Sequence, residues 1–171
     1  WQIGQKTPQE YARAFTEFGK VMKRVDPDIK LIASAVSLWT GDIVERAQLL
    51  LEQAGDLIDY MALHWYLGNP GNDFSTYMTQ REFVEERLSG YEGLIRALCM
   101  DNSIKRPVYI AVDEWNVWYR ARPYLNEEVY NLEDALVVAM NLNAFIRHAY
   151  SVRLANIAQI VNVIAPILTC P

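Results

Sequence analysis

Amphipathic helices and short apolar strands alternate along the 171 residues of the chain. Apolar residues at helical spacing predict helices over residues 8–25, 42–54, 80–100 and 131–150. Short apolar runs predict strands over residues 29–34, 57–64 and 107–112, and the run 154–164 fits a helix or a strand equally well. This alternation is typical of parallel β-α-β units, so the sequence predicts an α/β fold.

Local signals define the ends of several of these elements. The stretch Thr7-Pro8-Gln9-Glu10 combines a capping box with a proline at the first helical position, and Asp26-Pro27-Asp28 stops the same helix. Gly55 ends the second helix, whereas Gly90 and Gly93 weaken the middle of the third.

Polar and aromatic residues gather just past the carboxyl ends of the expected strands. They are Ser34 and Ser37, His64-Trp65-Tyr66, Asp113-Glu114-Trp115-Asn116, and Gln159 with Asn162. A parallel barrel has its active site at this edge, and no Gly-rich phosphate loop follows any strand. Four strands cannot close a barrel, so the pattern favours half of a (β/α)8 barrel over a complete doubly wound domain.

Composition excludes several classes of protein. A net charge of −5 without any Lys/Arg run argues against nucleic-acid binding, and the pairs Lys105-Arg106 and Arg120/Arg122 are expected to be solvated surface. Cys99 and Cys170 have no metal-ligand spacing and predict reduced thiols in an intracellular protein. No signal peptide is visible, and the longest apolar stretch is too interrupted to cross a membrane.

Glu114 is the strongest candidate for chemistry. It follows the nearly continuous apolar strand 107–112, which predicts a carboxylate at a barrel mouth. The alternative, a surface glutamate that begins a loop, is less favoured because Trp115, Trp118 and Tyr119 flank it. Asp113 is expected to point the opposite way, and to hold backbone or a neighbouring arginine.

The strand that ends at His64-Trp65-Tyr66 offers partners for this carboxylate. Alternation places His64 and Tyr66 on one side, although a histidine in an apolar strand is more often part of the core. A tyrosine hydroxyl can donate a hydrogen bond that orients a carboxylate. Aromatic residues around an acid suggest a sugar site, with Asn116 and Gln159 as partners for sugar hydroxyls.

Glycoside hydrolysis requires two carboxyl groups. Other acids, such as Asp42, Asp73 and Glu127, are not obviously placed to be the second one. The residues by themselves therefore predict a sugar-site carboxylate and leave its partner open.

Five segments, in collinear order over nearly the whole chain, resemble the family 51 glycoside hydrolases, the α-L-arabinofuranosidases. The segments are Trp1–Gln5, Tyr60–Gly68, Tyr109–Tyr119, Tyr130–Ala135 and Ala155–Ile167.

The resemblance implies that residues 1–171 are about the fifth to the eighth strand of a (β/α)8 catalytic barrel. It implies a retaining enzyme, without a cofactor or a metal, that releases terminal non-reducing α-L-arabinofuranosyl residues from arabinose-containing polysaccharides and oligosaccharides. Glu114 would be the nucleophile, Tyr66 would orient it, Gln159 would contact the sugar, and His64 and Trp118 would line the pocket. A cytoplasmic, homo-oligomeric parent enzyme, such as a hexamer, is also expected.

The resemblance also implies parts that this chain lacks. The family's acid/base glutamate belongs to a Gly-Asn-Glu motif just before the segment that resembles Trp1–Gly4, and the first half of the barrel and a C-terminal β-sandwich domain are expected to be absent as well. The piece alone is therefore expected to be inactive. Alternatives that share the strand-end glutamate are a β-xylosidase or endoglucanase of the same fold group, a non-catalytic sugar-binding fragment, and a generic α/β domain.

Overall fold

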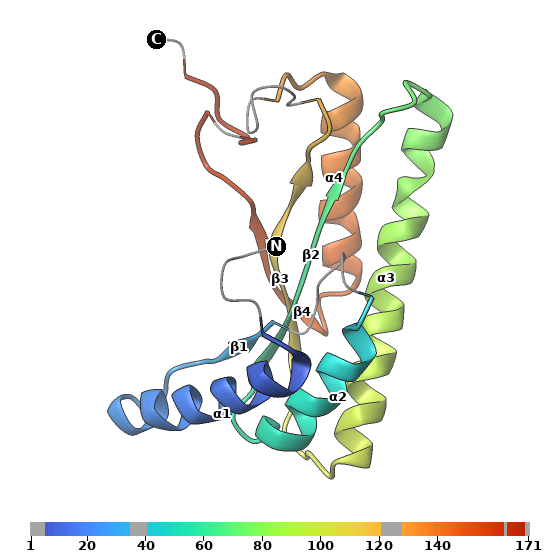
Figure 1. Cartoon of the computed structure of the whole chain (residues 1–171). Coiled ribbons are helices and arrows are strands. Elements are labelled where there is room, and N and C mark those ends of the chain that lie inside the picture. The colour runs from blue at the N-terminus through green and yellow to red at the C-terminus, as the bar shows by residue number, and fades with distance from the viewer. Residues whose placement is uncertain (1–5, 35–40, 121–127, 163, 170–171) are drawn as a thin grey trace. The chain divides into compact units, whose positions relative to one another are not determined.

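The computed structural model of the chain describes residues 6–34, 41–120, 128–162 and 164–169. In these residues helices and strands alternate (Figure 1): α1 (Pro8–Val25), β1 (Ile32–Ala33), α2 (Ile43–Ala54), β2 (Tyr60–Leu67), α3 (Phe74–Asp101), β3 (Tyr109–Val117), α4 (Leu132–Arg147) and β4 (Val152–Ile157). Strands that follow one another in the chain are neighbours in the sheet, and a helix joins each pair. The protein has the expected α/β fold with parallel strands, and β4 resolves the ambiguous last run as a strand.

The strands differ from the predicted ones in position. The first is reduced to two residues, which pair in parallel with Tyr60 and Met61 of β2. β2 and β3 begin later than predicted and continue through the polar residues, so Tyr66 and Glu114 lie within strands rather than beyond their ends. Backbone hydrogen bonds to neighbouring strands determine where β2 and β3 end. These bonds continue after the side chains become polar.

The observed helices agree more closely with the predicted ones than the strands do. α1 has the predicted bounds, and the Thr7 capping box is formed: the Glu10 N–H donates to the Thr7 hydroxyl at 3.2 Å. α3 begins six residues earlier than predicted, where the Asp73 carboxylate accepts the Ser75 N–H at 3.0 Å. Gly90 does not interrupt this helix. Within the described ranges, no helix is both long and apolar enough to cross a membrane.

The chain divides into two compact units. The first comprises Trp1–Leu63 and Tyr91–Ala111. In it α1 packs against α2. At the edge of its core, the Asp59 carboxylate accepts the Leu31 N–H at 2.9 Å and lies 3.3–3.6 Å from the cationic groups of Lys23, Lys30 and Arg106. Burial raises the pKa of Asp59, but these partners outweigh burial and lower it. Arg106, expected to be solvated, is thus partly buried and paired with Asp59.

The second unit comprises His64–Gly90 and Val112–Pro171. Its aromatic core joins β2, β3 and α4. The Phe145 ring lies 5.7 Å from the Trp65 ring and 5.0 Å from the Trp115 ring, centroid to centroid. The Trp65 indole N–H donates to the Asn141 amide oxygen at 3.0 Å, which satisfies a donor that is otherwise buried. The Trp65 side chain therefore faces α4. This is the side of β2 opposite to His64 and Tyr66, as alternation along the strand predicts.

Candidate active site

Glu114 and Tyr66 meet in the second unit. Glu114 is an exposed residue of β3, and the Tyr66 hydroxyl of β2 donates to its Oε1 atom at 2.5 Å. Burial raises the pKa of Tyr66, and the hydrogen bond to Glu114 raises it further. The phenol therefore stays protonated across the ordinary pH range and remains a donor to the carboxylate.

His64 and Asp113 form a second pair on the same two strands. The His64 Nδ1 atom lies 3.8 Å from the Asp113 Oδ1 atom, which is ion-pair distance and longer than a good hydrogen bond. The Asp113 carboxylate raises the pKa of His64, the Glu114 carboxylate adds to this effect, and burial opposes it. Asp113 was expected to hold backbone or an arginine, and the contact described for its carboxylate is with a histidine.

Trp118 follows β3 directly and packs on the tyrosine. The Trp118 and Tyr66 rings meet edge to face, with centroids 5.2 Å apart and planes at 67°. The Trp118 backbone N–H donates to the Leu67 carbonyl at 2.9 Å, so the backbone of Trp118 is held at the level where β2 ends. The structure thus brings together Glu114, Tyr66, His64 and Trp118 through β2, β3 and the residue after β3.

Gln159 lies just beyond β4 and is exposed. The backbone N–H of Ala158, the residue before Gln159, donates to the Trp115 carbonyl at 3.1 Å. Trp115 is the residue after Glu114 in β3. Its backbone is therefore close to β3.

Asn116 does not fit its expected role as a sugar contact. It is 4% exposed, and its amide donates to the Tyr130 hydroxyl at 3.1 Å and to the Ile164 carbonyl at 2.5 Å. These contacts bind three segments of the second unit together. Asn162 likewise donates to the Thr169 hydroxyl at 2.7 Å.

The acids considered as a second carboxylate have local roles where they are described. Asp42 accepts from Arg46 at 2.8 Å, one turn along α2, and Asp73 accepts at the start of α3. Glu127, like Ser37, Arg122 and Cys170, lies outside the described residues. Among the described side chains, no group of three or more His, Cys, Asp or Glu residues could hold a metal ion. The described site therefore offers one hydrogen-bonded, exposed carboxylate.

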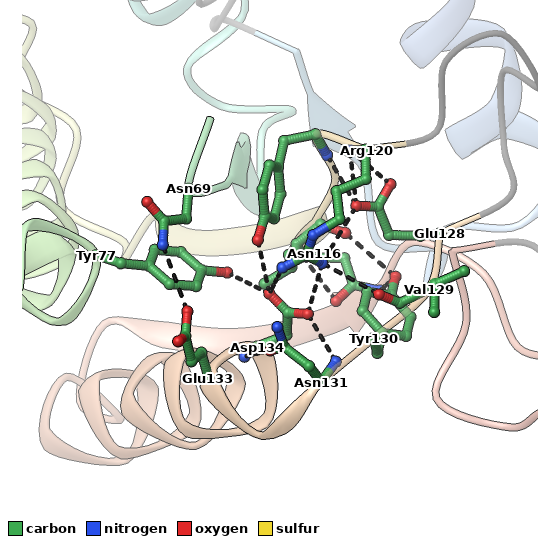
Figure 2. A network of polar contacts seen from close by, with 12 residues as sticks. Asn69, Tyr77, Asn116, Arg120, Glu128, Val129, Tyr130, Asn131, Glu133 and Asp134 are labelled. Carbon is green, nitrogen blue, oxygen red and sulfur yellow. Dashed lines mark hydrogen bonds and ion pairs between the residues drawn. The ribbon is translucent and has the colours of Figure 1, made fainter. Parts of the chain in front are cut away.

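A polar network beside the site was not foreseen from the sequence (Figure 2). Arg120, expected to be solvated, donates to the Asp134 carboxylate at 2.8 and 3.3 Å, and Asp134 is 1% exposed. Glu128, whose side chain is fully buried, belongs to the same network. One signal was available: Asn131 and Asp134 form a capping box at the start of α4.

Three comparisons relate the chain to known proteins. Residues 113–171 match the family model described as the α-L-arabinofuranosidase C-terminal domain. This segment begins one residue before Glu114 and includes the end of β3, α4 and β4.

Two curated relatives are similar over almost the whole chain. The intracellular exo-α-(1→5)-L-arabinofuranosidase of Halalkalibacterium halodurans is 37% identical over 182 residues, covering 99% of this chain and 36% of the relative. The intracellular exo-α-(1→5)-L-arabinofuranosidase 1 of Bacillus subtilis is 37% identical over 183 residues with the same coverage. The chain thus spans about a third of the length of these relatives.

Solved structures give the same relationship. The α-L-arabinofuranosidase of Thermotoga maritima in complex with arabinose is 39% identical, with a TM-score of 0.86 over 99% of this chain and 33% of that one. A family 51 α-L-arabinofuranosidase of Bifidobacterium longum is 25% identical, with a TM-score of 0.92 over 100% of this chain and 38% of that one.

Proposed function

Because this chain belongs to the family 51 glycoside hydrolases, the α-L-arabinofuranosidases, we propose that it supplies the nucleophile of a retaining arabinofuranosidase. The nucleophile is Glu114. The observation that supports this role most directly is the 2.5 Å hydrogen bond from the Tyr66 hydroxyl to the Glu114 Oε1 atom. That bond holds one oxygen of an exposed carboxylate and leaves the other available to a substrate.

The proposed reaction is a double displacement. The free oxygen of Glu114 attacks the anomeric carbon of a terminal α-L-arabinofuranosyl residue, and the bond from that carbon to the glycosidic oxygen breaks. A general acid protonates the departing oxygen, which leaves an arabinosyl ester on Glu114. Water, deprotonated by the same group, then attacks the anomeric carbon and releases arabinose with retained configuration.

Tyr66 orients the nucleophile in this proposal. Its raised pKa keeps the proton on the phenol, so it donates to the carboxylate without removing the negative charge. His64 and Trp118 line the sugar site in this proposal. His64 lies beside Asp113, the residue before Glu114, and the Trp118 ring packs on Tyr66. Gln159, exposed just after β4, contacts the sugar hydroxyls.

The second carboxyl group belongs to a part of the enzyme that these 171 residues do not supply. We place it in a Gly-Asn-Glu motif before Trp1, about 5–5.5 Å from Glu114 in the assembled site. The four parallel strands are then the later half of a (β/α)8 barrel, and the piece alone does not turn over substrate. This arrangement is supported by the coverage of only about a third of each relative.

We base the proposed substrate and cellular location on the relatives. Those named as exo-α-(1→5)-L-arabinofuranosidases support terminal non-reducing α-L-arabinofuranosyl residues of oligosaccharides and polysaccharides as the substrate class. Their description as intracellular supports a cytoplasmic location, and the family resemblance supports a homo-oligomer such as a hexamer.

The nucleophile can be tested by replacing it and offering a substitute. In the full protein that carries this sequence, Glu114→Ala should lose hydrolysis of 4-nitrophenyl α-L-arabinofuranoside. Azide should restore nitrophenol release and give the β-configured arabinosyl azide, because a small anion in the space left by the side chain attacks the same face. Asp113→Ala is the matched control, because it removes the neighbouring carboxylate.

Four results would contradict the proposal. Full activity of Glu114→Ala excludes the nucleophile, and an azide product of α configuration assigns Glu114 to acid/base catalysis instead. Turnover by the isolated 171-residue chain that Glu114→Gln abolishes would contradict the external acid/base group. Faster hydrolysis of a β-D-xyloside by the full protein would favour a xylosidase.

A further inference from the structure

The segment that follows β3, residues 118–120, is held by a set of polar side chains that are buried or partly buried (Figure 2). We call Tyr77, Arg120, Glu128 and Asp134 the anchor network. The Asp134 carboxylate accepts from both terminal nitrogens of Arg120, at 2.8 and 3.3 Å, and from the Tyr77 hydroxyl at 2.9 Å. The Arg120 guanidinium also donates to the Val129 carbonyl at 3.2 Å. Its planar fork therefore joins α4 to the chain just before it.

The Glu128 side chain binds the backbone of the same segment. Its carboxylate accepts the Tyr119 N–H at 3.2 Å and the Arg120 N–H at 2.8 Å. The two preceding N–H groups are also used: Val117 donates to the Asn116 amide oxygen at 2.8 Å, and Trp118 donates to the Leu67 carbonyl at 2.9 Å. Four consecutive backbone N–H groups are thus fixed where β3 ends.

The ring of Tyr119 is confined as well. A Cβ atom added at Gly68 would lie 2.5 Å from the Tyr119 Cβ atom, so these two segments approach more closely than a larger residue allows. The Arg120 guanidinium carbon lies 4.0 Å from the centre of the same ring, and the Tyr77 ring meets it edge to face at 6.0 Å. The segment therefore has little freedom to shift along the strand.

This segment carries Trp118 against Tyr66. The edge-to-face contact between these rings, with centroids 5.2 Å apart, is the last link before the 2.5 Å bond to Glu114. A continuous path of contacts thus runs from Asp134 and Glu128, through residues 118–120, to the carboxylate.

A buried ion pair is an expensive way to stabilise a protein, because both charges lose their hydration, and apolar residues of similar volume often stabilise as well. What a bidentate arginine–carboxylate pair adds is fixed geometry. Here the Asp134 side chain is 1% exposed and the Arg120 side chain is 29% exposed, and the pair has the bidentate geometry.

We propose that the anchor network positions Trp118, and through it the Tyr66 hydroxyl, on Glu114, so that Arg120 and Asp134 are positioning residues for the nucleophile. The inference rests on the proposed function and adds residues that do not touch the sugar. A displacement of about 1 Å at a reacting group can cost roughly 100-fold in rate, so a loosened network should reduce the rate of the chemical step.

The experiment compares Arg120→Lys with Arg147→Lys in the full protein that carries this sequence. Lysine keeps the charge at position 120 but cannot bridge both Asp134 oxygens. Arg147 donates to Glu85 in the same unit, outside the anchor network, and provides the matched control. Arg120→Lys should lower kcat by about 10- to 100-fold with little change in KM. It should also speed hydrogen exchange at the amides of residues 118–120, and Arg147→Lys should do neither.

Equal kcat values for the two variants overturn the proposal, and so does faster exchange at residues 118–120 without a change in kcat. If Arg120→Lys does not fold, Tyr77→Phe removes a single bond to Asp134 and should lower kcat in the same direction by a smaller factor. Glu114→Ala is measured in the same assay. Retained activity in Glu114→Ala removes the proposed function and this inference with it, whereas lost activity with an unchanged Arg120→Lys removes only the positioning role.

Discussion

Replacing Tyr66 with phenylalanine removes the hydroxyl that bonds to Glu114 and leaves the ring in contact with Trp118. The bond is 2.5 Å long, and its acceptor is a carboxylate. Hydrogen bonds to charged groups contribute about 1.5–3 kcal/mol. Glu114 is exposed, so water replaces part of this interaction, and the lower end of the range applies to its energy. One tenfold change in rate corresponds to about 1.4 kcal/mol, so the direct loss in kcat/KM is about tenfold.

The loss should exceed this value if the bond also orients the nucleophile, up to about 100-fold. The assay is initial-rate hydrolysis of 4-nitrophenyl α-L-arabinofuranoside by the full protein, with circular dichroism to show that each variant is folded. Tyr60→Phe is the control, because it makes the same change at the beginning of the same strand. A kcat/KM for Tyr66→Phe within about twofold of Tyr60→Phe would refute a role for this bond in catalysis.

Three further predictions concern stability, measured by urea denaturation of the full protein. Asn141→Leu leaves the buried Trp65 indole N–H without its acceptor and should lower the free energy of unfolding by about 1–3 kcal/mol, and no loss would mean that another acceptor replaces the amide. Gly68→Ala places a methyl group against Tyr119 and should destabilise by about 1–3 kcal/mol, whereas an unchanged midpoint would show that the ring can move. The pKa of His64 is raised in the folded protein. The contribution of His64 to the free energy of unfolding is therefore complete below about pH 6.5, the pKa of an unfolded histidine, and is lost as the pH rises through the pKa of the folded state. His64→Gln should lack this decline, and parallel pH curves for the two proteins would contradict it.

Local signals in the sequence were enough to define α1, and tertiary pairing was needed for the strands. The Thr7 capping box and the stop at Asp26 involve neighbours in the chain, and both ends of α1 agree with them. The ends of β2 and β3 depend on residues far away in sequence, so both strands run past the point where their side chains become polar. The early start of α3 could have been found from Asp73, which accepts from Ser75.

The candidate site was predictable where a single residue type carries the information. Glu114 and Tyr66 were paired from the pattern of two strands, and their side chains do meet. The partners of Arg120 and Asp113 could not be predicted, because a charge does not indicate which distant opposite charge it will meet. Asn116 was misassigned for a related reason: an amide beside a catalytic candidate can serve the sugar or the fold, and here it bonds to Tyr130 and Ile164.

The bond between Tyr66 and Glu114 also determines how the protein responds to chemical reagents. Nitrating and iodinating reagents attack phenolate, and burial together with the carboxylate bond raises the pKa of Tyr66 and suppresses that form. Exposed tyrosines, such as Tyr150 at 66% exposure, are more accessible to the reagent. Tyrosine modification at mild pH should therefore label the surface while Tyr66 stays intact, which would allow probes to be attached without changing the bond to Glu114.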